Sequence, residues 1–396
     1  MLINPRTKRA EFIFILVTIL SVGALAIDIM LPAMPQIADD LGASDPNAQQ
    51  LMVTYYMFGF GFSQLIYGPL SDSIGRKKAL HIGLWLSLLP IALSPFAPEY
   101  NALLALRFIQ GCGTGACRVL TPSIVRDMFE GREMAKIMSL TTMFYMITPM
   151  IAPSLGQLII EFGTWHHTFF FLAAVALIAL LWTGLRLPET LAEEHRKPFH
   201  LKPILMSFVE VATNRTTRWY AFANMAIFAT VIGFLGLSPQ IYLEIYDLGR
   251  FFPLMIAFTA TSIAVASLLN ARLVNHFDPE KIAIVANIIF VILALCWSVQ
   301  AWQLVTIPFW LFVITHQSMM LCFGLIGSNQ ITVAMQPMGH IAGTASSTIG
   351  FAHSAGGAAL GATIGFFYNG TIMPVAIGFL ACGLGSLLFM RLGKPS

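Results

Sequence analysis

Long apolar runs separated by short polar connections make up most of this chain. Twelve runs can be counted, each close to the roughly 20 residues that a helix needs to cross a bilayer. The pattern therefore predicts an all-α polytopic membrane protein. The predicted spans are residues 12–34, 48–68, 79–97, 101–124, 135–160, 167–187, 218–243, 251–272, 281–300, 305–328, 341–366 and 371–391.

One connection, residues 188–217, is longer than the others, polar and rich in proline. It divides the chain into residues 1–187 and residues 218–396, with half of the predicted spans in each part. Two halves of this kind, joined by a central loop, are typical of secondary transporters. We therefore expect an N-terminal six-helix bundle, a linker and a C-terminal six-helix bundle.

Composition supports a membrane protein and excludes other classes. The chain is 57% hydrophobic and 10% charged, with a mean hydropathy of +0.76, whereas soluble domains carry about 25% charged residues. The net charge of +3 is spread over loops and does not indicate nucleic-acid binding. The five cysteines lie in apolar runs without metal-ligand spacing, so neither a metal site nor a cofactor is expected.

The distribution of Lys and Arg predicts the orientation. Of the 22 such residues, Arg250 alone lies in one set of loops, and Arg107 and Arg118 lie within the fourth span. The remaining 19 lie at the opposite ends of the spans. Because cytoplasmic loops carry the excess of positive charge, both termini and the central linker are expected in the cytoplasm.

The first span contains one carboxylate, Asp28. A charged Asp at the centre of a membrane helix is unfavourable by roughly 2.5–3.5 kcal/mol, so a simple anchor would carry an apolar residue there. Pro32 has no N–H, and the Asp28 carbonyl therefore loses its helical partner. An acid beside a loosened turn indicates a proton or ion site. Snorkelling to the outer surface is the alternative.

Arg107 is expected at a similar depth. At a rise of about 1.5 Å per residue, Asp28 lies about 24 Å from the cytoplasmic face and Arg107 about 9 Å from the outer face. In a core about 30 Å thick both residues fall in the outer third. An ion pair between them, direct or through water, is then feasible. A structural role for Arg107 in helix packing is the alternative.

Other polar residues within the spans are candidates for a substrate cavity. Arg118 shares a helix face with Arg107, although a long side chain can also reach the cytoplasmic surface. His316 and His353 fall near the middle of the membrane, where imidazole can bind a proton or a ligand. A neutral histidine hydrogen-bonded between helices is the other reading of both. The remaining cavity candidates are Tyr145, Asn224 and Gln317.

The connection after the second span carries a glycine and charge pattern that an ordinary basic hairpin does not explain. It contains Gly68, Asp72, Gly75 and Arg76, followed by two lysines. The glycines permit a tight reversal, and Asp72 can sit near helix N-termini.

This pattern resembles a motif of the major facilitator superfamily, and two further stretches resemble other motifs of the same superfamily. Residues 103–113 look like the span-four motif, and Pro149, Pro153 and Gly156 look like the antiporter motif of span five. The segments around Asp28, Gln64 and residues 342–347 are similar to the bicyclomycin-resistance-type (Bcr/CflA) drug:proton antiporters. Gln157 departs from the antiporter motif, in which a second glycine is expected.

The resemblance implies twelve helices in two bundles and proton-coupled export of small organic molecules or drugs by alternating access. It implies that Asp28 and Arg107 couple protons and that the Asp72 loop forms a conformational latch. A dedicated metabolite or siderophore exporter, taking an anionic ligand, is the alternative, and proton-coupled uptake is a third reading. The expected partners are a small-molecule substrate, protons and the bilayer of a bacterial inner membrane, with the protein a monomer.

Two other classes are disfavoured. An enzyme would need a motif such as His-Glu-x-x-His or Gly-x-Ser-x-Gly, and the sequence has neither. A channel would need a repeated selectivity element, and we find none in the sequence.

Overall fold

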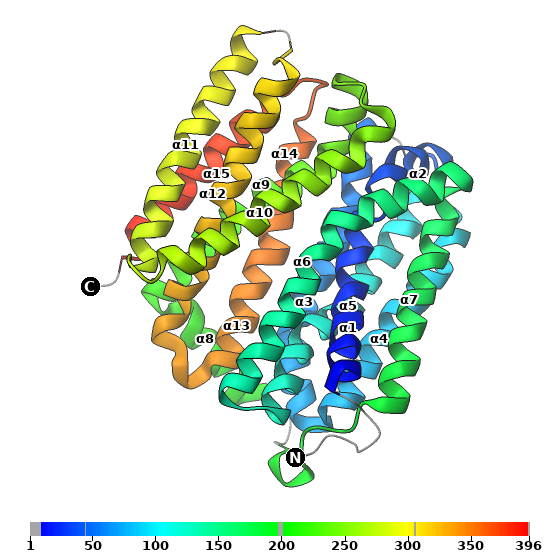
Figure 1. The fold of residues 1–396 in the computed structure, drawn as a ribbon, viewed down its shortest axis with the longest axis vertical. Coiled ribbons are helices and arrows are strands. Elements are labelled where there is room, and N and C mark those ends of the chain that lie inside the picture. The colour runs from blue at the N-terminus through cyan, green and yellow to red at the C-terminus, as the bar shows by residue number, and fades with distance from the viewer. Residues whose placement is uncertain (1–8, 44, 197–200, 305, 395–396) are drawn as a thin grey trace. The chain divides into compact units, whose positions relative to one another are not determined.

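Helices account for all of the described secondary structure in the computed structural model of this chain (Figure 1). The structure describes every residue except 1–8, 44, 197–200, 305 and 395–396. Within this described part, nine stretches are long and apolar enough to cross a membrane, and one of them, Phe309–Phe366, extends over 58 residues. The predicted all-α membrane architecture is therefore present, while the number of twelve spans stays a prediction.

The helices belong to two compact units. Unit 1 comprises residues 1–43 and 55–204. Its first helix packs against the fifth, sixth and seventh helices of this unit. The helices of unit 1 are α1 (Arg9–Asp28), α2 (Met34–Asp40), α3 (Leu51–Ile74), α4 (Arg76–Leu93), α5 (Tyr100–Met128), α6 (Gly131–Phe162) and α7 (Trp165–Arg186).

Unit 2 comprises residues 44–54 and 205–396. Two π-helical turns, Gln240–Ile245 and Ala352–Gly356, interrupt its helices. The first turn of α3 packs with this unit, together with the preceding residues, and Asn47 Nδ2 donates to the Tyr368 carbonyl at 2.9 Å. Helix α8 (Leu201–Thr213) belongs to unit 2 from Leu205 onward. The other helices of unit 2 are α9 (Arg215–Pro239), α10 (Phe252–Leu273), α11 (Pro279–Gln303), α12 (Phe309–Met335), α13 (Ala342–Phe351), α14 (Gly357–Phe366) and α15 (Met373–Leu392).

The surfaces of both units carry large apolar side chains. Leu185 in unit 1 and Leu268 and Ile314 in unit 2 are among the most exposed. Soluble monomers rarely expose large contiguous apolar patches, whereas lipid covers such surfaces at no cost. Several polar residues within the helices instead lie buried, among them Arg107, Asn224, Asn287 and Gln330. The helices therefore place their polar chemistry inside each unit.

The linker between the predicted halves differs from the expected polar loop. Residues 193–195 form a single 3-10 turn, and α8 follows before α9 begins. Residues 205–213 have an apolar side chain at most positions, which is why this segment can form a packed helix.

Candidate functional site

The first helix ends at Asp28. After two turn residues, the chain continues as the 3-10 turn Leu31–Ala33 and then as α2. This break is what Pro32 predicts, since a proline N donates no hydrogen bond. The Asp28 side chain is 7% exposed, and among the described residues its carboxyl has neither a hydrogen bond nor an ion pair. A buried carboxyl without a protein partner marks the centre of the candidate site.

Residues of α3 and α5 hold the last turns of α1. The Tyr56 hydroxyl donates to the Gly23 carbonyl at 3.0 Å and lies 2.8 Å from the Thr114 hydroxyl. Arg107, which is 1% exposed, donates from Nη2 to the Ala26 carbonyl at 2.8 Å. A guanidinium at the carbonyl end of a helix complements the helix dipole. The main chain two residues before Asp28 is thus fixed by a buried cation.

The direct ion pair between Asp28 and Arg107 that the sequence allowed does not form among the described residues. Arg107 Nη1 instead donates to Gln110 Oε1 at 2.7 Å, and the guanidinium lies 4.7 Å from the centre of the Tyr56 ring. The carbonyl, the amide oxygen and the aromatic face provide the stabilisation that a carboxylate would otherwise give. Arg107 therefore contacts the backbone next to Asp28, and not its side chain.

Helix α6 approaches the same break from another side. Pro149 and Pro153 lie within α6, and Gly156 follows one turn later. A Cβ atom at position 156 would lie 2.0 Å from the Ile29 carbonyl oxygen, so only glycine fits against the residue that follows Asp28. The three antiporter-motif residues thus belong to the helix that packs directly on the candidate proton site.

Arg118 and Tyr145 form a second pair in unit 1. The Arg118 guanidinium lies 5.9 Å from the centre of the Tyr145 ring, at the outer limit of a cation–π contact. Arg118 is exposed and Tyr145 is half-buried, so the positive charge is accessible on the surface of unit 1.

In unit 2, the structure brings His353 and Asn224 together. His353 lies in the π-helical turn before α14, and its ring stacks on Phe228 at 3.6 Å between centres. Asn224 Nδ2 donates to the Gly327 carbonyl at 3.1 Å, which leaves Asn224 Oδ1 as an acceptor. His353 Nδ1 lies 2.6 Å from this oxygen and must carry a proton. The network thereby sets the tautomer of His353.

A buried chain of polar side chains continues from Asn224. Its Nδ2 also lies 3.4 Å from Gln330 Oε1, and Gln330 Nε2 donates to the Ser386 hydroxyl at 2.8 Å. Asn287 Nδ2 donates to the same hydroxyl at 2.9 Å. The chain connects α9, α12, α15 and α11 through unit 2. We did not predict Gln330, Ser386 or Asn287, because isolated polar residues in apolar runs carry no spacing signal.

The other two cavity candidates of unit 2 have packing partners. His316 is fully buried and stacks on Phe234 at 3.9 Å between ring centres, and neither ring nitrogen has a partner within the described chain. His316 is therefore packed among aromatic side chains, but the hydrogen bonds of the alternative reading do not form within the described chain. Gln317 bridges α12 to α10 through Ser262 and Thr259, at 2.9 and 3.2 Å.

The motif after the second span centres on Arg76. Its Nη1 donates to Asp72 and to the Ser71 hydroxyl, and its Nε donates to Asp127 Oδ2 at 3.0 Å. The Ser71 hydroxyl donates to the Gly68 carbonyl at 2.8 Å. The pattern is therefore not a loop: α3 continues through it to Ile74, and its charges tie α3, α4 and α5 together.

Glu189 occupies the place that the sequence suggested for Asp72. Its Oε1 accepts from the Arg76 N–H at 2.7 Å, and Oε2 accepts from the Lys77 N–H at 3.2 Å, so Glu189 caps the N-terminus of α4. Asp72, in the last turns of α3, also lies near this end, but it contacts the side chain of Arg76 and not a backbone N–H group. Gly75 has φ of 99°, and a Cβ there would lie within 2.4 Å of Glu189. The only sequence signal for Glu189 is its place directly after Pro188.

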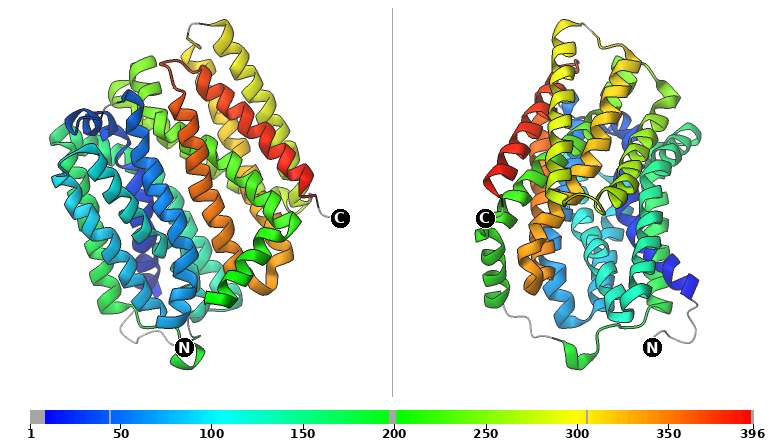
Figure 2. Two further views of the ribbon diagram at one scale, coloured as in Figure 1. Left: turned by 180° about the vertical axis from the view of Figure 1, so that it is seen from behind. Right: turned by 60° about the vertical axis from the view of Figure 1, so that its left-hand side comes forward.

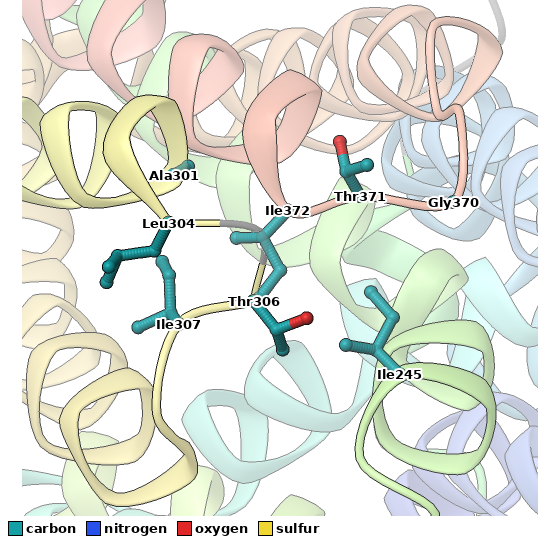
Figure 3. A pocket seen from close by; sticks show the side chains of 8 residues that line it. All are labelled: Ile245, Ala301, Leu304, Thr306, Ile307, Gly370, Thr371 and Ile372. Carbon is teal, nitrogen blue, oxygen red and sulfur yellow. The ribbon is translucent and has the colours of Figure 1, made fainter.

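One small pocket lies at the end of unit 2 (Figure 3). Its volume of about 30 Å³ is enough for a water molecule but not for an organic substrate. Among the described residues, no group of three or more His, Cys, Asp or Glu side chains is placed to hold a metal ion. The pocket is lined by Ile245, Ala301, Leu304, Thr306, Ile307, Gly370, Thr371 and Ile372.

Known proteins resemble this chain over nearly its whole length. Residues 15–362 match the family model described as Major Facilitator Superfamily. The chain is 31% identical to the uncharacterized MFS-type transporter YdgK of Bacillus subtilis, covering 100% of this chain and 98% of that protein. It is 30% identical to the bicyclomycin resistance protein homolog of Haemophilus influenzae, over 96% of each chain.

A solved structure shows the same fold. The crystal structure of a D-xylose-proton symporter matches with a TM-score of 0.77, over 97% of both chains. At 13% sequence identity, this match concerns the fold alone.

Proposed function

Because this chain belongs to the major facilitator superfamily, we propose that it is a proton-coupled exporter of small organic molecules that works by alternating access. The observation that carries the proposal is the buried Asp28 carboxyl at the break of α1, which has no protein partner among the described residues. Ionisable groups within membrane spans mark ion and proton pathways. The name of the bicyclomycin resistance relative supports export as the direction.

Membership in this superfamily confirms the resemblance found in the sequence and the helical transporter fold. It also confirms that the chain is a membrane transporter and not an enzyme. A multi-pass protein of this class fits a bacterial inner membrane, and we propose that it acts there as a monomer with both termini in the cytoplasm.

Proton binding at Asp28 would change the charge at the end of α1. The neutral form suits a buried site, and ionisation adds a negative charge beside two backbone contacts. One is the Arg107 bond to the Ala26 carbonyl, and the other is the contact of Gly156 with the Ile29 carbonyl. Each contact connects α1 to another helix of unit 1. A change of charge at Asp28 therefore acts on the contacts of α1 with α5 and α6.

The test is uptake of a panel of labelled compounds into inverted membrane vesicles, with and without a pH gradient. Inverted vesicles turn export into uptake. Accumulation against the substrate gradient that depends on the pH gradient supports the proposal. Accumulation that is indifferent to a protonophore contradicts proton coupling, and net loss from preloaded inverted vesicles would indicate an importer.

A second candidate function is export of an anionic metabolite or siderophore. The exposed guanidinium of Arg118 beside Tyr145 favours it, since a fixed positive charge attracts a carboxylate and disfavours a cation. Competition among matched cationic, neutral and carboxylate-bearing compounds distinguishes the two functions. Loss of carboxylate transport alone in Arg118→Gln would place Arg118 at the ligand, and strong preference for the cation in the unmodified protein would exclude this candidate.

A further inference from the structure

Helix α8 has apolar side chains on two faces. On one face, Val211 is buried against Met338 and Ala345 in a small core at one end of unit 2. Beside this core, Glu210 Oε1 lies 2.7 Å from His340 Nε2, which fixes the rotation of the helix about its axis. This face docks α8 on unit 2.

The second face points away from unit 2. Leu205 is 57% exposed, Met206 is 63% exposed and Val209 is 60% exposed. Leu205 and Val209 lie one turn apart, and Met206 lies beside them. In Figure 2, right, α8 stands beside α13 within unit 2, which agrees with the packing of Val211 on Ala345. Removing apolar side chains of this size from water is favourable, so water is an unfavourable surrounding for this face.

The position and the charge of α8 indicate what covers this face. Only Asn214 separates α8 from α9, which is part of a candidate membrane span, so the end of α8 lies at the level where the chain enters the bilayer. Residues 196–218 contain five basic residues and one acidic residue, Glu210. At the start of α9 the Arg218 guanidinium lies 5.2 Å from the centre of the Trp219 ring. Trp and basic residues together are typical of the membrane–water interface.

We propose that α8 lies in the membrane–water interface, with Leu205, Met206 and Val209 inserted among the lipid acyl chains. The described basic residues that flank α8, Arg196, Arg215 and Arg218, contact anionic lipid headgroups, which attract Lys and Arg near the membrane surface. Helices with one apolar face and basic flanks bind membranes in this way. The linker between the two units is thereby an interfacial anchor. The inference needs only that the spans cross a bilayer and does not depend on the substrate.

The test places a small fluorescent amino acid at position 205, 209 or 194, one at a time, by codon suppression. The full chain is reconstituted in vesicles of phosphatidylethanolamine and phosphatidylglycerol. Position 194, an exposed glutamate in the preceding linker, is the aqueous control. At 205 and 209 we expect at least threefold stronger quenching by doxyl-labelled lipid than at 194, and at least threefold weaker quenching by aqueous iodide.

Two results would overturn the proposal. Equal iodide quenching at all three positions would mean that the face lies in water. Protection from both quenchers at 205 and 209 would mean that a protein, such as a second copy of the chain, covers it. A separate arm compares vesicles with and without phosphatidylglycerol: weaker lipid quenching without the anionic lipid supports the role of the basic flanks, and unchanged quenching removes that role.

Discussion

Gly156 in α6 lies directly against the main chain that follows Asp28, since a Cβ at position 156 would be 2.0 Å from the Ile29 carbonyl oxygen. This contact explains why the antiporter-like segment has a glycine at position 156. It lets α6 approach the break in α1 closely enough to define the surroundings of the Asp28 carboxyl.

The first prediction is that Gly156→Ala disturbs both stability and transport. The added methyl group cannot fit without a backbone shift, and overpacking of this kind costs about 1–3 kcal/mol. We expect a lower midpoint of thermal denaturation in detergent and at least tenfold slower transport. The matched control is Gly184→Ala in α7, where the nearest atom, His81 Cε1, is 3.6 Å away. Equal behaviour of the two variants would contradict the role of the contact.

The second prediction concerns the cap of α4. Glu189→Ala removes the acceptor of the Arg76 and Lys77 N–H groups, and loss of an N-terminal cap costs about 0.5–2 kcal/mol. Thermal denaturation in detergent should show a lower midpoint. Glu193→Ala is the control, because the side chain of Glu193 is 87% exposed and forms an ion pair with Arg196. If both variants denatured at the same temperature as the unmodified chain, the Glu189 cap would not contribute to thermal stability.

The third prediction concerns the buried polar chain of unit 2. Asn224→Leu removes the donor to the Gln330 amide oxygen and the second donor to the Gly327 carbonyl, and an unsatisfied buried group costs about 1–3 kcal/mol. It also removes the acceptor that sets the tautomer of His353. The variant should denature at a lower temperature than Asn275→Leu, whose exposed amide donates to the Ala271 carbonyl one turn earlier. An unchanged midpoint for Asn224→Leu would show that the chain does not stabilise unit 2.

The sequence predicted the features that a regular pattern encodes. Apolar run lengths predicted the helices. Pro32 predicted a loosened turn at Asp28 within the span 12–34, and α1 ends at this residue, because a missing N–H has the same local effect in any fold. The family motifs predicted the fold, which the match to the superfamily confirms.

Contacts between distant segments could not be predicted in the same way. Depth arithmetic placed Asp28 and Arg107 at one level, but it could not show that Arg107 has a carbonyl, an amide and an aromatic ring as alternative partners. Glu189 caps α4 from 113 residues away in the sequence. The helix α8 was missed because its proline-containing, charged surroundings predict a loop.

The central claim is that Asp28 carries the coupled proton, and Asp28→Asn tests it most directly. Asparagine keeps the size of the side chain and cannot ionise. In inverted vesicles with an imposed pH gradient, we expect this variant to lose substrate accumulation against a gradient, at least fiftyfold, while its thermal stability and substrate binding are retained. Asp39→Asn, at an exposed position in α2, should accumulate substrate as the unmodified protein does. Accumulation by Asp28→Asn at the unmodified rate would contradict the account.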